Sequence, residues 1–269
     1  LGWGLLGALT LGGITYVSSS GIASQFIKDS RLESKESTKR AVSVLVIEDL
    51  FLAPYLPVLS ALLASLGFLS GLISISIALI ITGIVLLIGA RGFHIPHGPH
   101  ILGDSATLLL TVFGSALLAS GIATYFGFSG AVAAFLVGLL LTGDVAIVAR
   151  IRLAPLRDLF SAIFFLFFGL STNPSDIPEI LLPAILLTIV GVLSKLATAW
   201  WAVRDLDEVG ATWRAAALLI PRGEFSMVIA GLAATTVFAV ELQALTLTYV
   251  ILTTLISSLI IRTAKSKSS

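Results

Sequence analysis

Glu48 and Asp49 stand side by side within the apolar run LVIEDLFLA of residues 45–53. Ionisable side chains inside a membrane are expensive to bury, and by default they mark ion pathways or proton relays. Adjacent positions on a helix differ by about 100° around its axis, so the two carboxylates cannot both face the same partner. We therefore expect one acid to pair with a fixed cation, while the other holds either a proton or a small cation.

Three more charged residues lie in apolar surroundings further along the chain. Lys195 belongs to the segment GVLSKLA, and Arg222 and Glu224 belong to IPRGEF. Lys195 is alone near the middle of its apolar stretch, which makes it the candidate counter-ion for one of the two acids. Buried pairs that only hold helices together are the structural alternative, but five such groups in one small bundle favour a functional role.

The composition is that of a membrane-embedded chain. Of the 269 residues, 57% are hydrophobic and 12% are charged, whereas soluble domains contain about 25% charged residues. The formal net charge of +1 gives no bias toward a nucleic-acid partner. Cysteine is absent, which excludes disulfides and thiolate metal sites, and we expect no cofactor.

Nine apolar stretches are candidates for membrane helices, each of which needs about 20 mostly apolar residues. We therefore predict an all-α, polytopic protein embedded in the lipid bilayer. The sixth stretch is short unless it extends into residues 151–157. The stretches cover residues 3–27, 41–62, 70–90, 105–124, 129–148, 158–172, 180–202, 212–235 and 242–262.

Apart from Lys195 and Arg222, the basic residues lie in every second connection between these stretches and in the C-terminal tail. Cytosolic loops are rich in Lys and Arg, and the other connections, such as LGFLSG and STNPSDIPE, contain neither. The alternation places the first residue outside and the C-terminus in the cytoplasm, in a multi-pass protein of the cell (inner) membrane. The basic connections contain Lys28, Arg31, Lys35, Lys39 and Arg40, then Arg91, then Arg150, Arg152 and Arg157, then Arg204 and Arg214, and finally Arg262, Lys265 and Lys267.

Two of the predicted spans are interrupted. The eighth contains IPRGEF, where Pro221 removes a backbone donor and Gly223 loosens the next turn. Secondary transporters place their ion sites at discontinuous helices of this kind. The first contains TYVSSSG over residues 15–21, in which a glycine follows the hydroxyl-bearing Thr15, Ser18, Ser19 and Ser20.

The order of these motifs resembles the Kef-type branch of the second family of monovalent cation:proton antiporters. The interrupted hydroxyl-rich helix is followed by a basic loop, by VIEDL, by FFLFFGLS, by the intramembrane lysine and by PRGEFS. The resemblance covers nearly the whole chain, and VIEDL and RGEF are its most specific parts. It implies exchange of K+ or Na+ for H+ by alternating access, an inverted-repeat fold with two crossing discontinuous helices, and a homodimer of the full-length protein.

The resemblance also implies roles for the charged residues. Asp49 would be the carboxylate that binds the ion and the proton, and Glu48 would form an ion pair with Lys195. Arg222 and Glu224 would offset the partial charges of the half-helix ends at the second break. The chain departs from the family pattern in having Glu-Asp where relatives commonly show Asp-Asp, Asn-Asp or Gln-Asp, which leaves the stoichiometry of exchange open.

The domain organisation follows from the same resemblance. We expect one transmembrane transport domain over residues 1–269, with core helices at about 3–62 and 180–262, intervening helices at about 70–172, and a cytosolic tail at 263–269. The chain begins LGWGLL and its single methionine is Met227, so we also expect additional helices N-terminal to it.

Two further motifs carry weaker signals. HIPHGPH contains His94, His97 and His100; an ordinary solvated loop is the favoured interpretation, and cytosolic pH sensing is the alternative. GFSG matches a motif of intramembrane serine proteases, but a nucleophilic serine needs a base within hydrogen-bond reach. Ser129 lies on the opposite membrane side from all three histidines, so we expect no enzyme. A cation channel or K+ efflux pathway stays open as an alternative, although no TVGYG-like filter is present.

Overall fold

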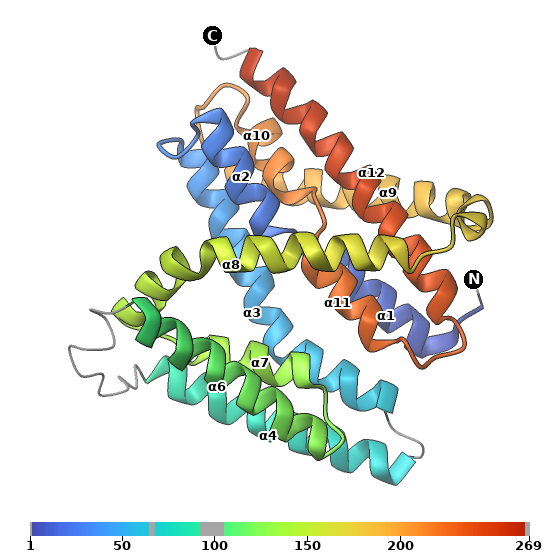
Figure 1. Ribbon diagram of the computed structural model, residues 1–269. Helices are drawn as coiled ribbons and strands as arrows, with labels where there is room; N and C mark the ends of the chain where they lie inside the picture. Colours follow the sequence, from blue (N-terminus) through green and yellow to red (C-terminus); the bar gives the residue numbers. More distant parts are fainter. Residues whose placement is uncertain (1, 65–67, 92–104, 267–269) are drawn as a thin grey trace. The chain divides into compact units, whose positions relative to one another are not determined.

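The computed structural model describes residues 2–64, 68–91 and 105–266 (Figure 1). Every regular element in these residues is a helix, so the predicted all-α class is confirmed. The histidine-containing segment, with His94, His97 and His100, lies outside the described residues. The elements are α1 (Gly4–Tyr16), α2 (Ser20–Ser30), α3 (Glu36–Ala64), α4 (Phe68–Ala90), α6 (Ser105–Tyr125), α7 (Gly130–Leu139), α8 (Gly143–Leu170), the short 3-10 helix η1 (Pro174–Asp176), α9 (Ile177–Val203), α10 (Ala211–Leu219), α11 (Glu224–Leu232) and α12 (Ala239–Ser266).

Seven helical segments among the described residues have the length and apolar composition needed to cross a membrane. The other two predicted spans contain shorter apolar helices, Ile75–Gly89 and Gly130–Leu139, so the predicted count of nine is not confirmed. The seven segments are Gly4–Ser30, Glu36–Ala64, Ala106–Tyr125, Val145–Leu170, Pro174–Val203, Ala211–Leu232 and Ala239–Arg262.

The predicted boundary between the fifth and sixth spans is wrong. Helix α7 ends at Leu139, and its 10 residues extend over about 15 Å, which is half of the ~30 Å hydrocarbon core. Gly143 then takes a positive φ of 61°, a conformation that glycine adopts readily, and α8 begins there. The segment with Arg150 and Arg157, expected to be a connection, is therefore part of a continuous 28-residue helix.

The chain divides into two compact units. Unit 1 consists of Leu1–Leu52 and Phe167–Ser269, and unit 2 is Ala53–Leu166. Helix α3 contributes to both units, and the boundary within it falls beside Pro54, a residue that cannot donate the backbone hydrogen bond of a regular helix. The core helices expected at about 3–62 and 180–262 belong to unit 1 except for residues 53–62, and their role as the transport core stays a prediction.

Small residues allow the helices of unit 1 to approach closely. Helix α10 packs against both α9 and α12, and every residue from Arg214 to Leu219 is buried. Alanines let helix backbones come together in a membrane, where dispersion and interhelical hydrogen bonds replace the hydrophobic effect as the driving force. The core between these helices includes Ala199, Ala202, Ala211, Ala215, Ala216, Leu218 and Leu219.

In unit 2, the GFSG motif forms the reversal between α6 and α7. Gly127 has a positive φ of 80°, and the hydroxyl oxygen of Ser129 accepts a hydrogen bond from the Val132 N–H at 3.4 Å, which caps α7. A Cβ atom at Gly130 would overlap the side chain of Ser120 on α6. The glycines and Ser129 therefore form a tight connection between two helices. This structural role explains why the GFSG motif is present.

An ionic network fixes the first turn of α3 to the connection between α9 and α10. The Glu208 carboxylate accepts a hydrogen bond from the Ser37 N–H at 3.1 Å, and so satisfies one of the donors that every helix N-terminus leaves unpaired. The same carboxylate forms ion pairs with Arg214 at 3.1 Å and with Lys35 at 3.9 Å. Burial opposes ionisation of Glu208, but the hydrogen bonds from Ser37 and the charge of Arg214 outweigh it and hold the pKa of Glu208 below its usual range.

A second ion pair joins the same two segments. Arg40 donates hydrogen bonds to both carboxylate oxygens of Asp205, at 3.2 and 3.0 Å, and to the Ala202 carbonyl at 3.1 Å. These hydrogen bonds lower the pKa of Asp205. The start of α3, which carries Glu48 three turns further on, is thus held against the end of α9, which carries Lys195.

Glu208→Gln should lower the free energy of unfolding by about 1–2 kcal/mol at neutral pH, because a charge-assisted hydrogen bond and a half-buried ion pair lose their anion. A group with a lowered pKa stabilises the fold above the pKa of its unfolded state, and this contribution is lost as the pH falls through the folded pKa. The difference between wild type and variant should therefore shrink on acidification. Thermal unfolding in detergent at a series of pH values measures it.

Asp207→Asn is the matched control, because Asp207 lies exposed in the same connection and loses the same charge. Equal effects of the two substitutions, or a difference that persists at acidic pH, would contradict the role of Glu208.

Candidate functional site

The two interrupted helices of unit 1 meet at their breaks. Ser19, in the break between α1 and α2, donates its N–H to the carbonyl of Pro221, in the break between α10 and α11, at 2.8 Å. The Ser18 hydroxyl donates to the Leu219 carbonyl at 2.6 Å. Contact is so close that a Cβ atom at Gly223 would overlap the Ser19 side chain. Both breaks, expected from TYVSSSG and IPRGEF, are therefore present and contact one another.

Arg222 brings its positive charge to the carbonyl ends of two half-helices. Its side chain is fully buried and donates to the carbonyls of Leu219 and Ile220, at 2.9 and 2.7 Å, at the end of α10. It also donates twice to the carbonyl of Thr15, at 3.1 and 2.8 Å, at the end of α1. These carbonyls have no partner within their own helices, and the C-terminal end of a helix carries partial negative charge. Arg222 therefore supplies both the hydrogen-bond donors that these carbonyls lack and a positive charge that offsets the helix ends.

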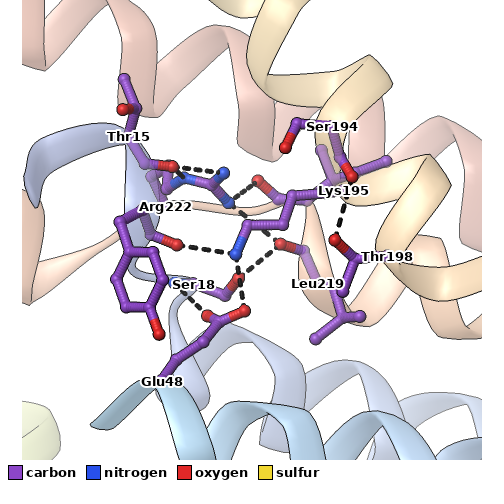
Figure 2. Close-up of polar contacts among 10 residues, drawn as sticks. Thr15, Ser18, Glu48, Ser194, Lys195, Thr198, Leu219 and Arg222 are labelled. Atoms are coloured by element: carbon purple, nitrogen blue, oxygen red, sulfur yellow. Dashed lines mark hydrogen bonds and ion pairs between the residues drawn. The ribbon is translucent and has the colours of Figure 1, made fainter. Parts of the chain in front are cut away.

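Lys195, from the middle of α9, reaches the same place from another direction (Figure 2). Its ammonium group donates to the Glu48 carboxylate at 2.5 Å and to the Tyr16 carbonyl, the last of α1, at 2.6 Å. The other Glu48 oxygen accepts a hydrogen bond from the Ser18 N–H at 2.9 Å. The ion pair between Glu48 and Lys195 expected from the sequence is thus present, with both side chains buried.

Glu224 provides the opposite charge at the other side of the break. It is the first residue of α11, and its carboxylate accepts a hydrogen bond from the Ser19 hydroxyl at 3.0 Å. The same hydroxyl oxygen accepts from the Ile22 N–H and caps α2. Anionic side chains stabilise helix N-termini, so one carboxylate offsets the positive ends of α2 and α11 while Arg222 offsets the negative ends of α1 and α10.

A cavity of about 440 Å³ lies beside the buried ion pair. Both Glu48 and Lys195 line it, and its polar lining from α9 also includes Ser194 and Thr198, which Figure 2 draws beside the pair. The complete lining consists of Gly12, Thr15, Tyr16, Val44, Ile47, Glu48, Leu187, Val190, Gly191, Ser194, Lys195 and Thr198.

The other predicted site residues, Asp49, Thr15 and Ser20, contribute to the site in different ways or lie beside it. Asp49 is partly exposed on α3 and is not among the residues lining this cavity. Thr15 contributes its carbonyl to Arg222, whereas its hydroxyl donates within α1 to the Leu11 carbonyl at 2.9 Å. Ser20 is the first residue of α2 and is partly exposed.

Two tyrosines of the site were missed by sequence reasoning. Besides its carbonyl contact, Tyr16 places its ring centroid 5.4 Å from the Lys195 ammonium nitrogen, and the guanidinium carbon of Arg222 lies 5.8 Å from the ring centroid of Tyr249. Such cation–π contacts stabilise desolvated cations. Tyr249 packs directly on Gly191, where a Cβ atom would overlap its hydroxyl. The position of Tyr16 directly before a helix break was a sequence feature that could have identified it as a site residue. No sequence feature indicated Tyr249.

Two crossed discontinuous helices with buried charges at the crossing are the architecture of a secondary transporter. The chain belongs to the transmembrane sodium/hydrogen exchanger family, whose model matches residues 1–265. It is therefore an integral membrane protein.

Curated relatives of known description share most of this chain. It is 28% identical to the K+/H+ antiporter subunit KhtU of Bacillus subtilis, over 98% of this chain and 66% of that protein. It is 30% identical to the ammonium/H+ antiporter subunit AmhT of Alkalihalophilus pseudofirmus, over 87% of this chain and 61% of that protein. It is 27% identical to the glutathione-regulated potassium-efflux system protein KefC of Escherichia coli, over 81% of this chain and 36% of that protein. The chain thus spans less than two thirds of the length of the relatives it matches.

Lys195→Met should lower the free energy of unfolding by about 3–5 kcal/mol, because it leaves the Glu48 carboxylate buried without its counter-ion. The double variant Glu48→Gln with Lys195→Met should recover much of this loss, since no uncompensated charge remains and the glutamine oxygen still accepts the Ser18 N–H. Unfolding in detergent of the wild type, both single variants and the double variant gives the coupling energy. Strictly additive effects would show that the pair is not coupled.

Gly223→Ala should destabilise the crossing of the two breaks, because the added methyl group overlaps Ser19. Gly231→Ala is the matched control in α11, the half-helix that follows Gly223, since a Cβ atom there meets no atom within 4 Å, and alanine is the better helix former by about 1 kcal/mol. We expect a lower melting temperature for the first variant and an unchanged or higher one for the second. Indistinguishable melting temperatures would count against close packing at the breaks.

Proposed function

We propose that this chain is the membrane part of a secondary transporter that exchanges a monovalent cation, K+ or Na+, for H+ by alternating access. The observation that carries the proposal is the buried Glu48–Lys195 pair, which lies beside a cavity where two discontinuous helices cross. Family membership supports exchange, and the relatives named above are described as K+/H+ and ammonium/H+ antiporters and as a potassium-efflux protein. All three descriptions concern a monovalent cation.

Glu48 and Asp49 have different roles in this mechanism. Glu48 is held by Lys195 and by the Ser18 N–H, so it serves as the fixed anion of the site. Asp49 is the carboxylate that binds a cation or a proton, and one displaces the other. Alternating exposure of Asp49 to the two sides of the membrane then couples the cation gradient to the proton gradient, since each passage carries only one of the two.

The charged side chains at the two breaks hold the half-helices around the site in place. Arg222 and Glu224 hold the four helix ends together, and the hydroxyls of Ser18 and Ser19 bridge the two breaks. In the full-length protein we place the site in the cell membrane with a cytoplasmic C-terminus, in a homodimer. Because KhtU and AmhT are described as antiporter subunits, a further subunit is also part of the proposal.

Asp49→Asn should abolish cation/proton exchange while leaving the fold intact. Asparagine keeps the shape of the side chain, but it has no charge for a cation and does not titrate. The assay uses the full-length protein in proteoliposomes with the membrane potential clamped, a proton-sensitive dye inside, and Na+ or K+ as the driving cation in turn. Saturable, pH-gradient-coupled flux distinguishes exchange from the conductance of a channel.

Glu48→Gln is the matched control, because it removes the same charge one residue away. We expect it to keep measurable exchange with altered pH dependence. Undiminished exchange in Asp49→Asn would falsify the mechanism, and loss of exchange in Glu48→Gln alone, with a melting temperature that shows a retained fold, would transfer the ion-binding role to Glu48.

A further inference from the structure

A second cavity with charged lining lies entirely within unit 2. It has a volume of about 250 Å³ and is bounded by the end of α7 and the first half of α8. Arg150 and Arg157 both line it, and seven residues on a helix bring side chains back to the same face. Between them the walls are apolar: the lining is Gly138, Leu141, Ala146, Ala149, Arg150, Leu153, Ala154 and Arg157.

A third arginine lies at the same end of this unit. Arg91 directly follows α4, and α4 and α7 are in contact. Their C-terminal ends meet, since a Cβ atom at Gly89 would lie 3.6 Å from the Leu139 carbonyl oxygen. One carboxylate reduces the positive charge, because Asp158 pairs with Arg157 at 2.7 Å. The end of unit 2 that carries the cavity therefore gathers guanidinium groups from two helices.

The surface beside the cavity is apolar. Ile147 and Ile151, on the same stretch of α8 as the arginines, are 60% and 70% exposed. In an integral membrane protein, exposed isoleucines meet lipid acyl chains, whereas the long side chains of arginines extend their charged ends toward the lipid headgroups. A ligand that fits both features has an anionic head and an apolar tail.

We infer that the cavity between α7 and α8 binds the headgroup of an anionic phospholipid. The phosphate accepts hydrogen bonds from Arg150 and Arg157, because guanidinium groups match phosphate geometry, and the acyl chains lie along Ile147 and Ile151. Basic pockets between membrane helices are suited to such headgroups. This lipid site is separate from the proposed exchange and does not depend on it.

The test is titration of the chain, purified in detergent, with phosphatidylglycerol, followed by native mass spectrometry. Phosphatidylcholine with the same acyl chains is the zwitterionic comparison. We expect selective binding of phosphatidylglycerol, and the double variant Arg150→Gln with Arg157→Gln should weaken it roughly 25-fold, since each arginine that contacts the phosphate contributes about fivefold. Melting temperatures of all variants verify folding.

Arg152→Gln is the matched control, because Arg152 is exposed on the same helix but does not line the cavity. It should leave the affinity within about twofold, as expected for an exposed charge that makes no direct contact. Equal binding of phosphatidylcholine, or equal effects of Arg152→Gln and the double variant, would overturn the site. Complete displacement of phosphatidylglycerol by an equal concentration of inorganic phosphate would overturn the lipid assignment in favour of a small anion.

Discussion

The end of a helix inside a membrane exposes backbone groups that no water can satisfy, and unit 1 is organised around that constraint. In the hydrocarbon core, each unsatisfied N–H or C=O group costs several kcal/mol. The breaks at Val17–Ser19 and Ile220–Gly223 create four such ends. Buried side chains satisfy them: Arg222 and Lys195 donate to carbonyls at the ends of α1 and α10, and Glu48 accepts the Ser18 N–H.

The same contacts gather charge at the crossing. A regular helix leaves no polar backbone group in its interior for another partner, whereas a break does, and here buried charged side chains are the partners. Arg222 and Lys195 bring two positive charges to the crossing, and Glu48 and Glu224 bring two negative ones. Glu48 is engaged by both Lys195 and the backbone, so the proposed exchange assigns the mobile cation to the adjacent acid, Asp49.

Support for this arrangement extends well beyond the breaks. The ionic contacts of Glu208 and Arg40 hold the start of α3 against the α9–α10 connection, and the alanines of α10 let it pack tightly against α9 and α12. Gly191 has a similar purpose, since only glycine leaves room for Tyr249 beneath Arg222. Polar contacts at the crossing therefore depend on apolar packing several turns away.

Much of this protein could be predicted from its sequence, because a membrane imposes strong local rules. Hydropathy identified the apolar segments, and charges inside them identified Glu48, Asp49, Lys195, Arg222 and Glu224. Pro221 and the serine run located both breaks, since these residues weaken a helix wherever they occur. The pairing of Glu48 with Lys195 was implied by the resemblance to the antiporter family, because the spacing of the two acids left open which of them pairs with the lysine. For the apolar segments, the charges inside them and the breaks, the determining interaction is with the bilayer or with the local backbone.

Tertiary structure alone decided which groups meet. Arg222 binds the carbonyls of residues 219 and 220 at its own break, where it was expected to offset the helix end, but it also binds the carbonyl of residue 15 in the other break, which no sequence pattern indicated. Thr15 contributes its backbone where its hydroxyl was expected, and Tyr249 reaches the site only because α12 packs on Gly191. The end of α7 at Leu139 was missed because residues 129–148 are apolar on both sides of the break. Local composition determines whether a segment belongs in the membrane. Which side chains and carbonyls it contacts depends on how helices that are distant in the sequence pack against one another.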